Sequence, residues 1–415
     1  MNKVKDLISF PKLTSVQIYL FQSYISLLVI FDIISRIMDF DIFYALKSVN
    51  QINYFFGNFE SENLLINFHR IHHLAPEAFF GIQILLSVLT ILKFFPRICL
   101  FLNFLILVSL HNYNPYVLYG GDVLLRTLLL LAVFLIPSDR TKFNFSGMSI
   151  WVVIACLYLM SFYYKIISPE WQNLSAINNA LKVKHLTTSF GSQFINSHIL
   201  IGVFTFLTLL FELLTPFLLI LKRSTFTIVA LGLILFFHTS LMFFLKVGMF
   251  SYICFSFIIL LYPLNGKFNL KIPPLKYRQS RFNTMALSFI SLLLIYVNLG
   301  QIWTQNVYNN DIISLTRLDH RWNMFHQPSL QMQNDNQYRV FMMPEAEQSG
   351  EQEIIKLKDH RWAKFFNNFN RIDAIASYYL DYSCKNNINF KNQEIIFEIN
   401  TRKNLQYIYN KICAL

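Results

Sequence analysis

The sequence contains nine apolar runs, and each is close to the length of a helix that crosses a bilayer. Hydrophobic residues make up 54% of the chain and charged residues only 14%, whereas soluble domains average about 25% charged. That much apolar side chain exceeds what one water-soluble core can bury. We therefore predict an all-α polytopic membrane protein with about nine transmembrane helices. The runs lie at residues 15–37, 76–95, 97–113, 120–137, 148–167, 198–221, 225–246, 247–263 and 283–303.

The chain changes character after residue 303. Residues 1–303 form the predicted helical membrane domain, and residues 304–415 form a polar tail. The tail contains strand-like alternation in QYRVFMM and QEIIFEINT, and a helical pattern in HRWAKFFNNFNRIDAIASYYL. We therefore expect a small C-terminal α+β domain.

The net charge of +12 belongs almost entirely to the membrane part. No basic stripe with interleaved aromatic residues is present, which argues against nucleic-acid binding. Most basic residues of residues 1–303 fall in alternate connecting segments, and such clusters stay on the cytoplasmic side. This predicts a multi-pass protein of the cell membrane with a cytoplasmic N-terminus and an extracytoplasmic tail. The basic segments are 1–14, 93–97, 138–147, 222–224 and 264–282.

The five cysteines have no spacing typical of a metal site. Cys99, Cys156 and Cys254 fall in apolar runs and are expected to be core residues. Cys384 and Cys413 lie in the tail, where they could pair if the tail faces an oxidising compartment. We expect no metal, since the histidines of FHRIHH (residues 68–73) have no acidic or thiol ligand at a fixed spacing.

Several ionisable residues interrupt the apolar runs, where they are costly. Lys165, in FYYKIISPEW, could extend its amine to the interface, or it could be a base activated by aromatic neighbours. His238 could be a satisfied core histidine or part of a site, and Lys246 is expected in the same helix. Glu212, one turn before Pro216, could relay protons or bond to a neighbouring helix.

Another group of polar residues borders the third and fourth runs. Asp122 and Arg126 are four residues apart, so they share a helix face and can pair; a structural ion pair is favoured over a substrate site. His111, Asn112, Asn114 and Tyr119 precede them at the predicted outer face.

The order of these motifs resembles the bacterial HTTM (horizontally transferred transmembrane) family, which includes the vitamin K-dependent gamma-carboxylase. The resemblance covers roughly residues 15–330. The matching pieces are LLVIFDIISRIMDF, SLHNYNPYVLYGGDVLLRTLLLLAVFLIPSDR, YYKIISPEWQNLSAINNAL, FELLTPFLLIL, FFHTSLMFFLKVGMFSY and RWNMFHQPS.

The resemblance implies a pocket that opens on the extracytoplasmic side. It implies Lys165 as the base that deprotonates reduced vitamin K or another quinol, with Trp171 as its companion tryptophan and His238 as a further catalytic residue. Carbon dioxide and oxygen would be the co-substrates. We expect the substrate or quinone pocket to comprise His111, Asn112, Asn114, Tyr119, Asp122, Arg126, Trp171, Met249 and Tyr252.

The sequence leaves the function open between two classes. The first is a membrane enzyme, carboxylase-like, that uses a quinol for carboxylation or a related oxidation at the outer face. The alternative is a non-catalytic accessory protein for maturation or export of a secreted peptide, which binds a hydrophobic peptide or lipid. A transporter is less favoured, since the hydropathy shows no inverted repeat.

Overall fold

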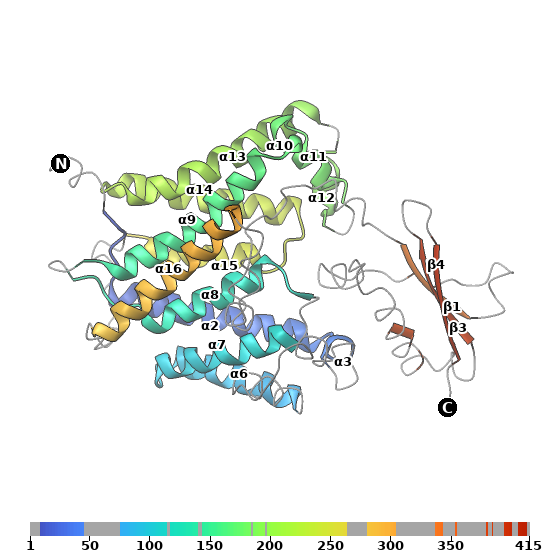
Figure 1. Cartoon of the computed structure of the whole chain (residues 1–415), viewed down its shortest axis with the longest axis horizontal. Helices are drawn as coiled ribbons and strands as arrows, with labels where there is room; N and C mark the ends of the chain where they lie inside the picture. The colour runs from blue at the N-terminus through green and yellow to red at the C-terminus, as the bar shows by residue number, and fades with distance from the viewer. Residues whose placement is uncertain are drawn as a thin grey trace.

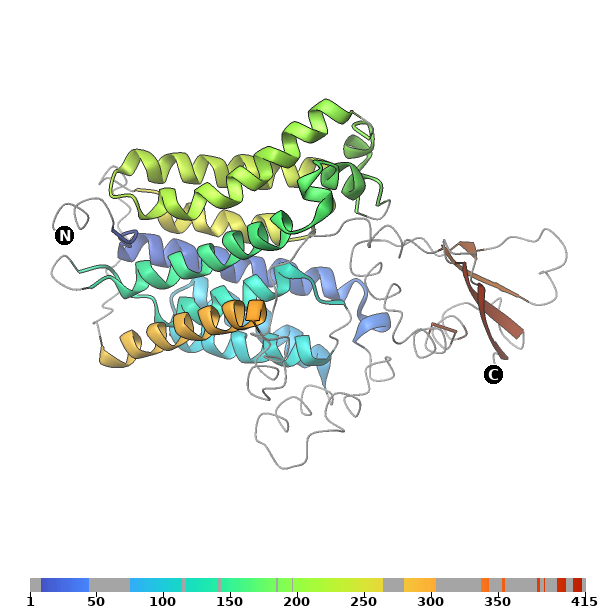
Figure 2. The same ribbon diagram turned by 45° about the horizontal axis from the view of Figure 1, so that its top comes forward.

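The computed structural model is a bundle of helices with a small β-sheet beyond one end (Figures 1 and 2). Helices occupy all nine apolar runs, with bounds within a few residues of those expected. The structure describes residues 9–44, 75–113, 117–139, 143–183, 186–195, 197–263, 280–303, 337–342, 353–354, 379–380, 384, 394–400 and 406–412.

The long helices form the bundle, and short helices cap one end of it (Figure 2). The long helices are α2 (Ser15–Ile37), α6 (Pro76–Ile91), α7 (Pro96–Tyr113), α8 (Gly120–Phe134), α9 (Phe145–Ile166), α13 (His198–Ile220), α14 (Ser224–Phe244), α15 (Phe250–Leu261) and α16 (Arg281–Trp303). The short helices are α3 (Phe40–Phe43), α10 (Pro169–Gln172), α11 (Ala176–Leu181) and α12 (Ser189–Ser192).

Five of these helices, α2, α9, α13, α14 and α16, are long and apolar enough to cross a membrane. The chain is therefore a multi-pass membrane protein. The other helices in the nine runs are shorter or less apolar, so the total of nine crossings stays a prediction.

Local sequence explains several helix boundaries. Thr14 caps α2: its hydroxyl accepts a hydrogen bond from the Gln17 amide, and its own amide donates to the Gln17 side chain. Pro76 and Pro96 each begin a helix, where a missing N–H has no cost. Helix α14 ends at Phe244, so the expectation that Lys246 lies inside this helix is wrong. Lys246 is exposed beyond the helix end.

Two of the basic connecting segments, 1–14 and 138–147, meet the end of α13 at one end of the bundle. The Ser9 amide donates to the Ile220 carbonyl at 2.8 Å. The Leu13 amide donates to the Ser138 hydroxyl at 2.9 Å, and the Asn144 amide group donates to the Pro11 carbonyl at 2.6 Å. These contacts agree with the alternation of segments between two sides. The compartment that this end faces stays a prediction.

The centre of the bundle contains α2, α8 and α9, whereas α13 and α14 form its margin. Helix α8 buries almost all of its residues and packs against α2, α7, α15 and α16. Helices α13 and α14 pack against each other, with α13 on α9 and α14 on α15. Both leave rows of large apolar side chains exposed, as expected of helices that face lipid.

The tail contains a four-stranded antiparallel sheet in the order β2-β1-β3-β4. Its strands are β1 (Gln337–Met342), β2 (Glu353–Ile354), β3 (Glu394–Asn400) and β4 (Gln406–Ile412). Strands β1 and β3 confirm the two predicted strand patterns, and Val340 pairs with Phe397 across them. Most of the helical pattern expected before residue 380 lies outside the described residues, and the division into two domains at residue 303 stays a prediction.

The tail also contacts the bundle near its one described cysteine. Leu380 is buried in the main hydrophobic core, and Cys384 packs against that core. Cys384 is disulfide-bonded, whereas Cys99, Cys156 and Cys254 are free. Cys413 lies outside the described residues. The three thiols in apolar helices are thus core residues, as their positions predict.

Candidate functional site

A buried ion pair joins the end of α9 to the middle of α13. The Lys165 ammonium contacts Glu212 Oε1 directly and donates to the Ser161 hydroxyl at 3.0 Å. Ser161 in turn donates to Glu212 Oε1 at 2.9 Å. Ser161 and Lys165 lie four residues apart on one helix face, so both reach the same carboxylate. Glu212 therefore bonds to a neighbouring helix, one of the two roles expected for it from the sequence.

Trp171 covers the ammonium from the capping side. The helix α10, which carries it, begins at Pro169 directly after α9. Lys165 Nζ lies 4.8 Å from the centroid of the Trp171 ring, within the range of a cation–π contact. The tryptophan is buried at 3% exposure. Lysine and tryptophan of the same motif thus meet at one place, and the amine does not extend to the interface.

His238 lies in the same region, within an aromatic cage. Its Nε2 is 2.9 Å from the Tyr158 hydroxyl, and its ring meets those of Phe237 and Phe250 edge to face, at 82° and 65°. His238 is fully buried, and its Nδ1 has no hydrogen-bond partner among the described residues. One of the two ring nitrogens of His238 therefore has a hydrogen-bond partner among the described residues, and the other has none.

These polar groups line one cavity of about 250 Å³. Its walls are otherwise apolar and come from α9, α11, α13 and α14, with Trp171 and Phe250 completing them. A few polar groups in an apolar hollow are typical of a small-molecule site. The polar side chains in the lining are Tyr158, Ser161, Lys165, Thr208, Glu212, His238 and Ser240.

The chemistry available to this cavity depends on the ion pair. Lys165 can accept a proton only as a neutral amine, because a charged ammonium has no lone pair. Glu212 keeps one oxygen, Oε2, without a hydrogen-bond partner among the described residues. Proton transfer at this site would therefore involve the pair as a unit. The aromatic neighbours alone do not determine the state of Lys165.

A second buried cluster joins α2, α7 and α8. Arg36 donates to Asp32 at 2.8 Å, to Asp122 at 2.6 Å and to the Tyr44 hydroxyl at 2.5 Å. Its Nη2 also lies 3.3 Å from His111 Nε2. Every one of these side chains is nearly or completely buried. One guanidinium thus ties together three segments that are distant in the sequence.

Arg126 completes this cluster, which we call the Arg36 network: Asp32, Arg36, Tyr44, His111, Asp122 and Arg126. Arg126 Nη1 is 2.5 Å from His111 Nδ1. Two arginines and two aspartates balance in charge if His111 is neutral. The Asp122 carboxylate also accepts the Tyr119 amide, which caps the start of α8.

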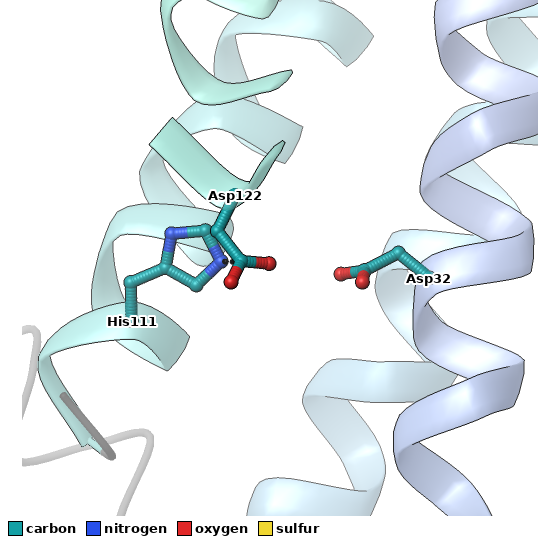
Figure 3. A group of neighbouring side chains, drawn as sticks. All are labelled: Asp32, His111 and Asp122. Carbon is teal, nitrogen blue, oxygen red and sulfur yellow. Dashed lines mark ion pairs between the residues drawn. The ribbon is translucent and has the colours of Figure 1, made fainter. Parts of the chain in front are cut away.

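Figure 3 shows Asp32, His111 and Asp122 of this network, whose ligand atoms lie within 4.8 Å of one another. Such a set could in principle bind a metal ion. The Arg36 guanidinium, however, donates to both carboxylates and approaches the imidazole. A cation between these groups would have to displace it. The donor set therefore fits an ion-pair network better than a metal site.

The expected site residues separate into these two clusters. Lys165, Trp171 and His238 line the cavity. His111, Asp122 and Arg126 belong to the Arg36 network, and Asn112 is buried beside them at the end of α7. Asn114 lies outside the described residues.

The remaining expected residues lie near the start of α15. The Met249 amide donates to the Tyr119 hydroxyl at 3.0 Å, which links this segment to α8. Tyr252 is 45% exposed and is not part of the cavity lining. Neither residue lines the cavity, although their neighbour Phe250 does.

Reasoning from the sequence did not assign Tyr158, Ser161 or Glu212 to the site. Two of them carry weak signals: Ser161 is four residues before Lys165, and Glu212 is an acidic residue in an apolar run. Only the packing of α13 on α9 pairs the acid with the lysine.

No protein-family model, curated protein or solved structure matches this chain.

Proposed function

We propose that this membrane protein binds a quinol or a quinol-like lipid in the Lys165 cavity and uses Lys165 as the base that deprotonates it. The proton leaves the quinol hydroxyl for the amine, and oxygen then reacts with the quinolate. This would drive carboxylation or a related oxidation of a second substrate at the outer face. The observation that carries the proposal is the buried Lys165–Glu212 pair in the wall of an apolar cavity.

The geometry supports a specific role for Glu212 in this step. Lys165 acts as a base only as the neutral amine, which is present when the shared proton resides on the Glu212 carboxyl. Uptake of the quinol proton then produces an ammonium next to the new quinolate, so opposite charges meet in a site of low dielectric. Trp171 lies over the amine, and the surrounding cavity wall is mostly apolar, which disfavours water beside the amine.

Oxygen-dependent turnover of reduced quinones tests this proposal. The full chain in detergent would be assayed with vitamin K hydroquinone, comparing wild type, Lys165→Ala and Lys246→Ala. We expect loss of Lys165 to reduce turnover by about 10²–10⁴-fold, the usual contribution of a general base. The exposed Lys246 provides a matched lysine outside the cavity, and its loss should leave turnover unchanged. Undiminished turnover in Lys165→Ala, or none in folded wild type, would refute the proposal.

One observation favours the alternative of a non-catalytic accessory protein. Lys165 contacts Glu212 directly in the cavity, and a lysine held in an ion pair can bind ligands without taking protons. In this case the same cavity would bind a hydrophobic peptide or lipid during maturation or export of a secreted peptide. Ligand binding by wild type without quinol turnover would support this function over the first.

We further propose that the tail is extracytoplasmic and the N-terminus cytoplasmic. The basic segments and the disulfide at Cys384 support this orientation, because disulfides persist in oxidising compartments. A cysteine placed at Glu394, at the start of β3, should react with a membrane-impermeant maleimide in intact cells. One placed at Lys222, between α13 and α14, should react only after permeabilisation. The reverse pattern would overturn the orientation.

A further inference from the structure

We propose that the Lys165 cavity opens sideways into the bilayer through a window between α13 and α14. Through it the cavity receives an amphiphile whose apolar tail lies in the window and whose uncharged, hydroxyl-bearing head reaches Lys165 and Glu212. This inference rests on the proposed function for the site that receives the ligand, but it does not require catalysis.

Two aromatic contacts frame the window. Helices α13 and α14 are consecutive, run antiparallel and lie side by side at one margin of the bundle (Figures 1 and 2). Phe204 meets Phe244 with ring centroids 5.8 Å apart, and Phe211 stacks on Phe237 at 4.2 Å. The two contacts are seven residues apart on each helix, about two turns. The helices are thus in contact above and below a gap of about 10 Å along their axes.

Small and flexible side chains lie between the two aromatic contacts. The antiparallel register places Leu207 and Thr208 opposite Ser240 and Leu241, and all four line the cavity. The hydroxyls of Thr208 and Ser240 donate to carbonyls of their own helices, at 2.9 and 2.8 Å. Neither hydroxyl therefore leaves an unsatisfied donor that would make contact with an apolar tail unfavourable. A larger side chain at Ser240 would fill space that the window leaves open.

The cavity reaches the lipid-facing surface along this margin. Leu207 is 43% exposed and Phe236 is 64% exposed, yet both line the cavity. Leu210 and Leu214 combine the same two properties one and two turns further along α13. In a membrane helix, exposed apolar side chains of this kind contact acyl chains. An apolar molecule can thus pass from the bilayer to the cavity without crossing a polar surface.

The capping side of the cavity, by contrast, is closed by backbone contacts. Thr187 and Leu245 form a β-bridge, and the Lys246 amide donates to the Leu186 carbonyl at 2.6 Å. At Gly191 of α12, a Cβ atom would lie 2.3 Å from the Phe244 carbonyl oxygen. The cap is therefore in direct backbone contact with the end of α14. Entry through the cap would require these contacts to separate, whereas entry through the window requires only side-chain rotation.

The polar wall of the cavity indicates the charge of the head group. Lys165 and Glu212 compensate each other, so a charged head group would enter a site of low dielectric without a free counter-charge. Glu212 Oε2 and His238 Nδ1 both lack hydrogen-bond partners among the described residues. A hydroxyl can donate to the carboxylate and can either donate to or accept from the imidazole. An uncharged hydroxyl head therefore suits both groups.

A pair of ligands and a matched pair of variants test the window. The full chain in nanodiscs would be titrated with radiolabelled menaquinol, which carries an isoprenoid tail, and with menadiol, which has the same head and no tail. In Ser240→Phe we expect affinity for menaquinol to fall about tenfold or more, a loss equivalent to about 1.4 kcal/mol, with little change for menadiol. Ser288→Phe on α16, half-exposed and away from the cavity, should change neither affinity.

A labelling experiment on wild type keeps the inference testable if Ser240→Phe fails to fold. Menaquinol with a photoreactive diazirine on its tail should label peptides of α13 and α14. Labelling confined to α10–α12, an equal effect of Ser240→Phe on both ligands, or absence of menaquinol binding would each overturn the inference. Binding through the window without oxygen-dependent turnover would refute the enzymatic proposal alone.

Discussion

The two buried polar clusters differ in what surrounds their charges. In the Arg36 network, one guanidinium contacts two carboxylates, a phenol and an imidazole, and the side chains fill the space between α2, α7 and α8. In the Lys165 cluster, one ammonium contacts one carboxylate beside a cavity. Glu212 and His238 each keep a polar atom without a partner among the described residues. The first arrangement suits a structural role, and the second suits ligand binding.

The residues expected in one quinone pocket fall in different parts of the structure, and that pocket stays a prediction. The expected pocket includes His111, Asp122 and Arg126. These residues lie in the Arg36 network, and the cavity is lined by other helices. Substitutions in the two clusters should lower the free energy of unfolding by different amounts.

The largest loss of stability should follow removal of the Arg36 guanidinium. Arg36→Met leaves Asp32 and Asp122 buried without their shared cation. We expect the free energy of unfolding to fall by about 3–5 kcal/mol, as for other broken buried ion pairs. Thermal unfolding of the purified protein in detergent would measure this. Arg281→Met, at an exposed arginine, is the control. An equal loss of unfolding free energy in the two variants would contradict a structural role for the network.

Neutralising Glu212 should cost less, because one cation loses a single partner, whereas Arg36→Met leaves two carboxylates without theirs. Glu212→Gln keeps a hydrogen-bond acceptor for Ser161 and Lys165 but removes the charge. We expect a loss of about 1–3 kcal/mol. A double-mutant cycle with Lys165→Met should show a coupling of about 0.5–3 kcal/mol. Glu77→Gln on the exposed start of α6 is the control, and additive effects of the two cavity variants would contradict the observed pair.

The smallest effect should come from the hydrogen bond of the aromatic cage. Tyr158→Phe removes the hydroxyl that contacts His238 Nε2 and keeps the ring that packs on Phe211. We expect a loss of about 1 kcal/mol, typical of one hydrogen bond. Tyr296→Phe, at a tyrosine 59% exposed on α16, should change the unfolding temperature little. A larger loss for Tyr158→Phe than for Arg36→Met would reverse the roles assigned to the two clusters.

Helix positions were predictable because apolar run length is a property of the local sequence. Each of the nine runs became a helix, and the strands β1 and β3 formed where alternation occurred. The error at Lys246, by contrast, has a non-local cause. Its apolar neighbours continue the run, but the chain leaves the helix at Phe244 to form a bridge with Thr187. Run length alone contains no information about that bridge.

Charge pairing was much less predictable than helix position. Asp32 and Arg36 lie four residues apart and form a local pair, as such spacing permits. Arg36 also binds Asp122, which is 86 residues away, and Lys165 binds Glu212, which is 47 residues away. No spacing rule connects these partners. They meet because α2 packs on α8 and α9 packs on α13.

The sequence by itself determined that the chain crosses a membrane with many helices, because hydrophobicity and helix length act through each residue and its near neighbours. It also drew attention to Lys165, Trp171 and His238, which share one cavity. Only the tertiary structure decided that Lys165 has a carboxylate partner, that the Arg36 network is separate, and that the cavity adjoins the lipid-facing margin. These features depend on which helix faces meet, and helix packing is a non-local property that the periodicity of a single run does not specify.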